Sequence, residues 1–136
     1  MCWVALIVNE PGTAACAAWY EAAKGELVSA GWCVTEFGSA LGLKQRTAQL
    51  DADQARDAWT WFERLVANDV RPLSVERVDF HRAAMLTLDA SSGIRAADAL
   101  HLACAERVGA SSLVTLDTVM AKNARRLKLR PVPLSS

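Results

Sequence analysis

Three acidic residues of this 136-residue sequence stand among apolar neighbours, where a lone carboxylate is costly to bury. Asp98 lies within the stretch from Gly93 to Ala105, which carries apolar residues on every side of a helix and is therefore typical of a buried helix. Glu36 lies in a second apolar helical stretch, and Asp117 directly follows a short apolar run. Asp98 therefore needs a cation, a metal ion or the end of another helix as its partner.

The position of Asp117 indicates the chemistry that the three acids could perform together. It follows an expected strand at its carboxyl end, which is where open α/β sheets bind ligands. If Glu36 and Asp98 converge on the same sheet end, the three carboxylates form an oxygen-rich site for Mg²⁺ or Mn²⁺. A metal ion held in this way can activate water and stabilise the charge that develops during in-line cleavage of a phosphodiester.

Each acid also has a purely structural explanation. Asp117 can be the N-cap of the helix that follows it. Glu36 can be a paired acid of the core, and Asp98 can favour the dipole at the start of its own helix. All three explanations must hold separately for the site to be absent, so the convergent site is the preferred hypothesis.

Several basic or polar residues near the acids have two possible roles. Arg95 can contact phosphate or can pair with Asp98, because the two lie one helical turn apart. His101 is expected to be a core residue or a residue that supports a ligand. A basic cluster near the C-terminus is either a solvated face or an RNA contact; its members are Lys122, Arg125, Arg126, Lys128 and Arg130.

The elements that must position these residues alternate along the chain. Hydrophobic periodicity and capping signals predict helices and strands in turn. The expected helices are 14–24, 32–46, a helix opened by the N-cap Asp51 with Gln54, 76–90 with Phe80, Ala83, Ala84 and Leu88 facing inward, 94–108, and 118–127. The expected strands are 26–29, 70–75, 113–116 and 129–134, with Pro72, Pro131 and Pro133 at edges. This alternation predicts an α/β fold with a mostly parallel sheet between helices.

Composition limits the remaining possibilities. Apolar residues make up 52% of the chain and charged residues 22%, which suits one globular domain over residues 1–136. The formal net charge is zero, so no global field attracts nucleic acid or membranes. No apolar run is long enough to span a membrane. The four cysteines have no metal-binding spacing, and we expect a reducing, cytoplasmic setting.

The motifs and their order resemble those of the PIN-domain ribonucleases, and most closely the VapC-type toxins of bacterial toxin–antitoxin pairs. The most specific of them is Ile-Arg-Ala-Ala-Asp-Ala-Leu-His-Leu-Ala at 94–103. The others are Val-Asn-Glu-Pro-Gly-Thr at 8–13, Thr-Glu-Phe-Gly-Ser-Ala-Leu at 35–41 and Leu-Val-Thr-Leu-Asp at 113–117.

The resemblance implies a three-layer α/β/α sandwich around a mostly parallel sheet, and metal-dependent endonucleolytic cleavage of RNA. Glu36, Asp98 and Asp117 would be the catalytic residues and the ligands of Mg²⁺ or Mn²⁺. Arg95, Thr115, Lys122, Arg125 and Arg126 are the candidates for contact with RNA. The resemblance also implies a small antitoxin as a partner, and a homodimer.

The sequence departs from the family at its start. Members begin with a short apolar strand that ends in an aspartate, whereas here 4–10 matches the helix that follows that strand, and no Asp precedes Asp51. Two explanations are open: a start recorded several codons too late, which we favour, or a true truncation. In the second case the chain would be a PIN-like remnant that binds an antitoxin or RNA without cleaving it.

Overall fold

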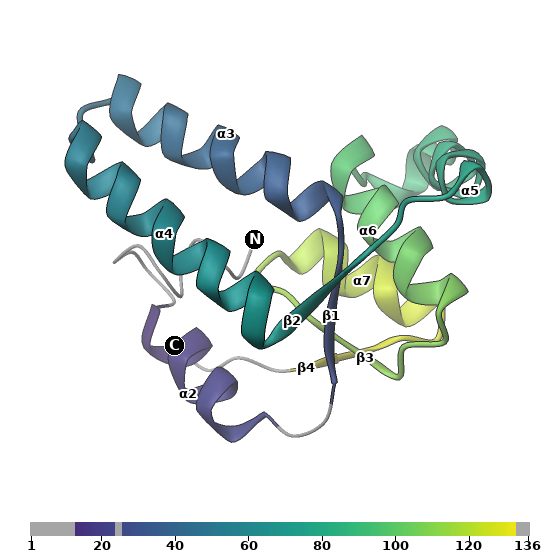
Figure 1. Ribbon diagram of the computed structural model, residues 1–136. Helices are drawn as coiled ribbons and strands as arrows, with labels where there is room; N and C mark the ends of the chain where they lie inside the picture. Colours follow the sequence, from purple (N-terminus) through teal and green to yellow (C-terminus); the bar gives the residue numbers. More distant parts are fainter. Residues whose placement is uncertain (1–12, 24–25, 133–136) are drawn as a thin grey trace.

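The computed structural model describes residues 13–23 and 26–132, in which short strands lie between single helices or pairs of helices (Figure 1). The elements run in the order α2 (Thr13–Ala22), β1 (Leu27–Ala30), α3 (Trp32–Arg46), α4 (Ala52–Asn68), β2 (Val70–Leu73), α5 (Arg77–Leu88), the 3₁₀ turn η1 (Ala90–Ser92), α6 (Ala96–Arg107), β3 (Ser112–Val114), α7 (Thr118–Arg126) and β4 (Arg130–Val132). The chain is an α/β sandwich of helices and short parallel strands, as the sequence predicted.

The strands form two separate parallel pairs. β1 pairs with β2, with Leu27 opposite Val70, and β3 pairs with β4, with Ser112 opposite Arg130. The predicted parallel direction is confirmed, but within the described residues the two pairs do not join into one sheet. Among residues 13–23 and 26–132, β2 and β4, which contain Pro72 and Pro131, each pair on one side only, as expected for strands that carry proline.

Helices α3 and α4 form an antiparallel hairpin with an aromatic core. The ring of Phe37 stacks on that of Phe62 at a centroid distance of 4.2 Å, and Trp59 packs against both rings. The predicted capping box at the start of α4 is present, because the Asp51 side chain accepts from the backbone N–H of Gln54 and the Gln54 side chain accepts in return. The hairpin is thus fixed by local capping and by ring packing.

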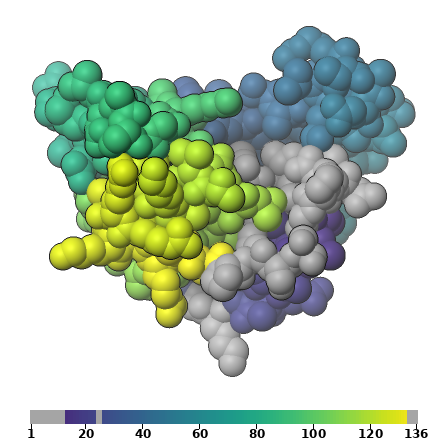
Figure 2. Space-filling view, turned by 180° about the vertical axis from the view of Figure 1, so that it is seen from behind, coloured from purple at the N-terminus to yellow at the C-terminus, as the bar shows by residue number. Residues whose placement is uncertain are grey.

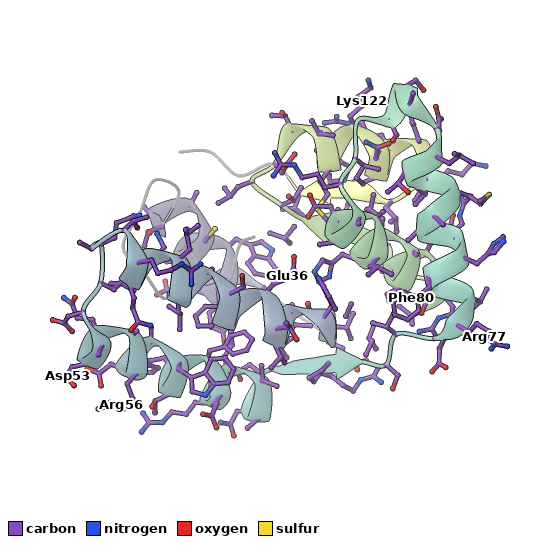
Figure 3. The ribbon with its side chains drawn as sticks, turned by 90° about the horizontal axis from the view of Figure 1, so that it is seen from above. Glu36, Asp53, Arg56, Arg77, Phe80 and Lys122 are labelled. Atoms are coloured by element: carbon purple, nitrogen blue, oxygen red, sulfur yellow. The ribbon has the colours of Figure 1, made fainter. Side chains whose placement is uncertain are left out.

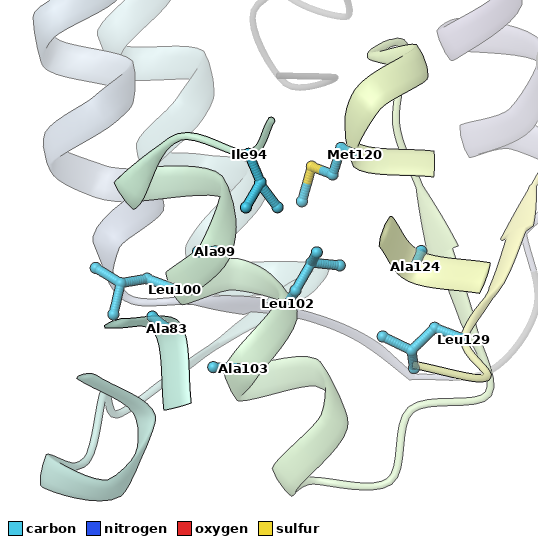
Figure 4. Close-up of a cluster of buried hydrophobic side chains, with 9 residues drawn as sticks. All are labelled: Ala83, Ile94, Ala99, Leu100, Leu102, Ala103, Met120, Ala124 and Leu129. Atoms are coloured by element: carbon cyan, nitrogen blue, oxygen red, sulfur yellow. The ribbon is translucent and has the colours of Figure 1, made fainter. Parts of the chain in front are cut away.

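The second core surrounds α6, which lies between α5 and α7 (Figure 4). In the part of the chain that the structure describes, its buried set consists of small and aliphatic side chains without an aromatic one: Ala83, Ile94, Ala99, Leu100, Leu102, Ala103, Met120, Ala124 and Leu129. The prediction that α6 is a buried helix is therefore confirmed. Alanine at so many of these positions lets the helices approach closely.

Helix α5 faces the core with a different side from the predicted one. Only Ala83 of the four residues expected to face inward is buried, whereas Phe80 is 53% exposed, Leu88 is 75% exposed and Ala84 is also exposed. The buried side carries Asp79, which is 1% exposed. The prediction was wrong because an ion pair of Asp79, described below, requires this carboxylate to face α6.

The helix expected over 4–10 and the edge position expected for Pro133 lie outside the described residues. None of the helices within the described ranges is long and apolar enough to cross a membrane. Seen from behind, the far end of the α3–α4 hairpin and helix α5 form two opposite corners of the molecule (Figure 2).

Candidate active site

A cavity of about 760 Å³ separates the two strand pairs, and the three predicted acids all line it. Glu36 comes from α3, Asp98 from the first turn of α6, and Asp117 from the position just before α7. Glu36 lies near the centre of the molecule when it is viewed from above (Figure 3). The structure therefore places on one cavity residues that are as far apart in the sequence as Glu36 and Asp117, which are more than 80 positions apart.

Glu36 is positioned by a tight turn and by a histidine. β1 passes into α3 through Gly31, whose N–H donates to the Leu73 carbonyl at 2.7 Å. A side chain at Gly31 would lie 3.2 Å from the same oxygen, so the close approach favours glycine. In the cavity, His101 Nε2 is hydrogen-bonded to Glu36 Oε1, and both side chains are largely buried. His101 thus supports a candidate ligand, which is one of the two roles that the sequence left open.

Asp98 lies in an environment that disfavours its charge. Burial raises the pKa of this carboxyl above its ordinary value, and the charges of Asp117 and Glu36 raise it further. Within the described part of the chain, no hydrogen bond or ion pair joins Asp98 to Arg95, which is exposed at the N-cap of α6. The partner that the sequence required for Asp98 is therefore not Arg95.

Asp117 is the N-cap of α7, which is one of the two roles that the sequence offered, and it also lines the cavity. Its Oδ1 accepts from the backbone N–H groups of Val119 at 2.8 Å and Met120 at 3.0 Å, which makes it the N-cap of α7. Its own N–H donates to Thr115 Oγ1 at 3.0 Å. Because both capping bonds go to Oδ1, they leave Oδ2 available for a ligand in the cavity.

The three carboxylates have the oxygen ligands that a hard divalent cation prefers, but in this structure they do not surround a single position. Among residues 13–23 and 26–132, no three His, Cys, Asp or Glu side chains are close enough to hold one metal ion. The donor set nevertheless consists of oxygen atoms, which Mg²⁺ and Mn²⁺ prefer. A bound cation would also offset the repulsion that raises the pKa of Asp98. Glu36, Asp98 and Asp117 are therefore the residues that would hold it.

The candidate RNA contacts are distributed unevenly. Thr115 lines the cavity, but the exposed side chains of Lys122, Arg125 and Arg126 on α7 do not. Lys122 lies at the edge of the molecule, away from Glu36 (Figure 3). The guanidinium of Arg126 is 4.0 Å from Asp89. An RNA strand would have to extend from the cavity over the outer face of α7 to reach this cluster.

Sequence reasoning missed the ion pair that the buried carboxylate of Asp79 on α5 makes with Arg107 on α6. Arg107 Nε donates to both oxygens of Asp79, at 2.9 and 3.0 Å, and the Cys104 thiol lies 3.4 Å from the same carboxylate. Burial and the bond to Asp79 raise the pKa of Cys104 to about 11. The available signal was a carboxylate at the third position of α5 after the N-cap Glu76, to whose backbone N–H Asp79 also bonds.

Comparison with known proteins assigns the class. The sequence matches the PIN domain family over residues 2–126, and the chain belongs to this family. No curated protein matches the chain. Membership supports a nuclease type of function acting on RNA, and PIN domains generally depend on a divalent metal ion.

Proposed function

We propose that this protein is a metal-dependent endoribonuclease and acts as the toxin of a toxin–antitoxin pair. The observation that carries the proposal is the convergence of Glu36, Asp98 and Asp117 from three separate elements on one cavity of a PIN-family chain. Burial raises the pKa of Asp98, and the charges of Asp117 and Glu36 raise it further, which supports the action of the three acids as one site.

The chain's own residues would divide the work. The three carboxylates would bind Mg²⁺ or Mn²⁺, which supplies the positive charge and Lewis acidity that phosphodiester hydrolysis needs. His101 would hold the Glu36 carboxylate in one orientation. Thr115 in the cavity, and Arg95 with the α7 cluster outside it, would contact the RNA backbone.

Replacement of Asp98 by Asn tests the proposal. Asp98→Asn removes a ligand charge and should reduce Mn²⁺-dependent RNA cleavage by about a hundredfold or more. The pKa of Asp98 is raised in the fold, so its contribution to stability is present below its unfolded pKa and is lost as pH rises through the folded value. The variant should therefore be at least as stable as the original protein at neutral pH without metal.

Asp53→Asn is the matched control, because Asp53 lies on α4 outside the cavity and its side chain is 89% exposed. This variant should cleave RNA normally. Cleavage by the Asp98→Asn variant at the original rate would contradict the assignment.

A PIN-like remnant that binds without cleaving is the second candidate. It is favoured by the absence of a ready-made cluster of three ligands among the described residues. Calorimetric titration of Mn²⁺ into the purified chain, together with an RNA cleavage assay, separates the two. Tight Mn²⁺ binding with RNA cleavage supports the enzyme, whereas the absence of both supports the remnant.

A small antitoxin and a second copy of the chain are proposed as partners, and the cytoplasm as the location. The partner proposal is supported by exposed apolar residues along α5, where Val78 is 60%, Phe80 53% and Leu88 75% exposed. Cys33 and Cys104 are free thiols, which suits a reducing compartment.

A further inference from the structure

A buried asparagine on α7 contacts the turn that leads into α6. Asn123 is 2% exposed, and its side-chain amide donates two hydrogen bonds, each at 2.9 Å. One goes to the carbonyl of Ser92, the last residue of η1, and the other goes to the carbonyl of Val119 in its own helix. Because an amide is unfavourable to bury unless it is hydrogen-bonded, these two bonds must hold the side chain in one orientation.

Ser92 connects three helices. Its hydroxyl donates to the Leu86 carbonyl of α5 at 2.9 Å and accepts at 3.2 Å from the N–H of Ile94, two residues before α6. Its carbonyl accepts from Asn123 of α7. The chain passes into α6 through Gly93, whose φ of 63° lies in the left-handed region that favours glycine. We call residues 92–94 the α5–α6 turn.

The same asparagine is linked to Asp117 through one residue. The N–H of Val119 donates to Asp117 Oδ1 at 2.8 Å, and the carbonyl of Val119 accepts from Asn123. A Cβ at Gly93 would lie 3.9 Å from Val119 Cγ1, so the α5–α6 turn also lies against the first turn of α7. Asn123 therefore connects the residue that caps α7 to the start of α6.

Two of the three candidate ligands lie on either side of this connection. Asp98 is in the first turn of α6, shortly after the α5–α6 turn, and Asp117 begins α7. Burial raises the pKa of Asp98, and the charge of Asp117 raises it further, so the two carboxylates lie within electrostatic reach of each other. Ile94 and Met120, which belong to one buried cluster, point toward one another at the same contact (Figure 4).

We propose that Asn123 is a positioning residue of the candidate metal site, because its amide fixes the α5–α6 turn against α7 and so sets the distance between the carboxylates of Asp98 and Asp117. This role rests on the proposed metal-dependent function and deepens it. Asn123 is not among the described residues that line the cavity, so it acts through the two ligands and contacts neither metal nor RNA. Groups that orient metal ligands from outside contribute about tenfold to a hundredfold in metal affinity or activity.

Calorimetric titration of Mn²⁺ into the full chain, without RNA, tests this role in the variants Asn123→Leu and Asn123→Ala. Both remove the two hydrogen bonds, but leucine keeps most of the buried volume and alanine leaves a cavity. Both should bind Mn²⁺ about tenfold more weakly than the original protein. A loss of folded protein alone would lower the number of Mn²⁺ ions bound per chain and leave the dissociation constant unchanged. An unchanged dissociation constant in both variants, or a change in Asn123→Ala alone, overturns the role of the amide.

Ala55→Gly is the matched control for stability. Ala55 is 5% exposed near the start of α4, and glycine there weakens the helix and removes a buried methyl group. This variant should unfold at a lower urea concentration, as Asn123→Leu should when it deprives the Ser92 carbonyl of its donor. It should nevertheless bind Mn²⁺ with the original dissociation constant. An equal weakening of Mn²⁺ binding in Ala55→Gly would assign the effect to instability and overturn the positioning role.

RNA cleavage gives a second measurement. Asn123→Leu should lower kcat about tenfold and change KM for RNA by less than about twofold, because the two ligands are displaced while the proposed RNA contacts remain. A higher Mn²⁺ concentration should restore part of the lost kcat. A raised KM with an unchanged kcat would place Asn123 in RNA binding and overturn the proposal.

The two proposals fail in different ways. If the original protein binds Mn²⁺ and cleaves RNA, and both Asn123 variants do so equally well, only the positioning role is lost. If Asn123→Leu and Asn123→Ala weaken Mn²⁺ binding but the original protein cleaves no RNA with Mn²⁺, the nuclease function is lost and the positioning of a metal site stands.

Discussion

The two hydrophobic cores of this protein differ in the size of the side chains that fill them. The core of the α3–α4 hairpin rests on a few large rings, with Phe37 0% and Phe62 2% exposed. The core around α6 rests on many small side chains, such as Ala99 and Ala103, and is bordered by the ion pair between the buried Asp79 and the partly exposed Arg107. Large rings gain stability from buried area, whereas small side chains gain it from close approach of the backbones.

The difference bears on the site, because the acids come from both regions. Glu36 belongs to the hairpin region, and Asp98 and Asp117 belong to the alanine-rich region. The bond between His101 and Glu36 connects the two regions across the cavity. The relative position of the regions therefore sets the spacing of the three carboxylates.

Truncation of a ring should be the most harmful single change. Phe62→Ala removes the partner stacked on Phe37 and leaves a cavity, so we expect a loss of about 3–5 kcal/mol in the free energy of unfolding. Urea denaturation measures it. Trp61→Ala on the same helix is the control, because Trp61 is 61% exposed and should cost about 1 kcal/mol or less. Equal losses would show that the hairpin is not held by its aromatic core.

Loss of the guanidinium beside Asp79 should rank second. Burial raises the pKa of Asp79, but the bonds from Arg107, the Glu76 backbone and Cys104 outweigh it, so the net pKa lies below its usual value. The pair therefore stabilises the fold above the unfolded pKa, and this contribution is lost as pH falls through the folded value.

Arg107→Met removes the guanidinium from the buried Asp79 carboxylate and should lower the free energy of unfolding at neutral pH by less than Phe62→Ala does. The deficit should shrink below about pH 4, where Asp79 is protonated in the unfolded chain. Urea denaturation at several pH values measures the loss in the free energy of unfolding and its dependence on pH. Arg82→Met is the control, because its pair with Glu106 is 43% and 36% exposed and should contribute about 1 kcal/mol at most. A pH-independent deficit would contradict this account.

A larger side chain should destabilise the alanine-rich core around α6, whereas a smaller side chain should destabilise the aromatic core of the α3–α4 hairpin. Ala99 is 0% exposed, so Ala99→Leu should overpack the contact of α6 with its neighbours and cost about 1–3 kcal/mol. Ala96→Leu, at an exposed position of the same helix, should be close to neutral in thermal unfolding. A neutral Ala99→Leu would mean that this core has spare room.

The smallest effect concerns the contact of α2 with the end of α4. Burial and a hydrogen bond to Asp69 raise the pKa of Tyr20 to about 12. This tyrosine is the only one in the chain, so an ultraviolet titration of the phenol reports it alone. Asp69→Asn should lower the midpoint toward 10.0. The contribution to stability is present below the ordinary pKa and is lost as pH rises toward 12.

Local signals predicted the helices well. α3 begins and ends as expected at Trp32 and Arg46, and the capping box of Asp51 and Gln54 opens α4. These features depend on residues that are close in sequence. The buried face of α5 depends instead on Arg107, 28 positions after Asp79, and a pattern within α5 could not reveal that partner.

The candidate site shows the same limit. Residue type and apolar surroundings identified Glu36, Asp98 and Asp117, and the structure places all three on one cavity. The bond between Glu36 and His101 spans 65 positions, and the separation of the strand pairs depends on non-local pairing. Neither leaves a periodic signal, so both required coordinates.

The prolines of the outer strands have a consequence for the protein in crowded solution. Pro72 in β2 and Pro131 in β4 cannot donate a backbone hydrogen bond. Each stands in a strand that pairs on one side only within the described residues, where a neighbouring molecule could otherwise begin a fibril. The outer rim therefore resists edge-to-edge aggregation.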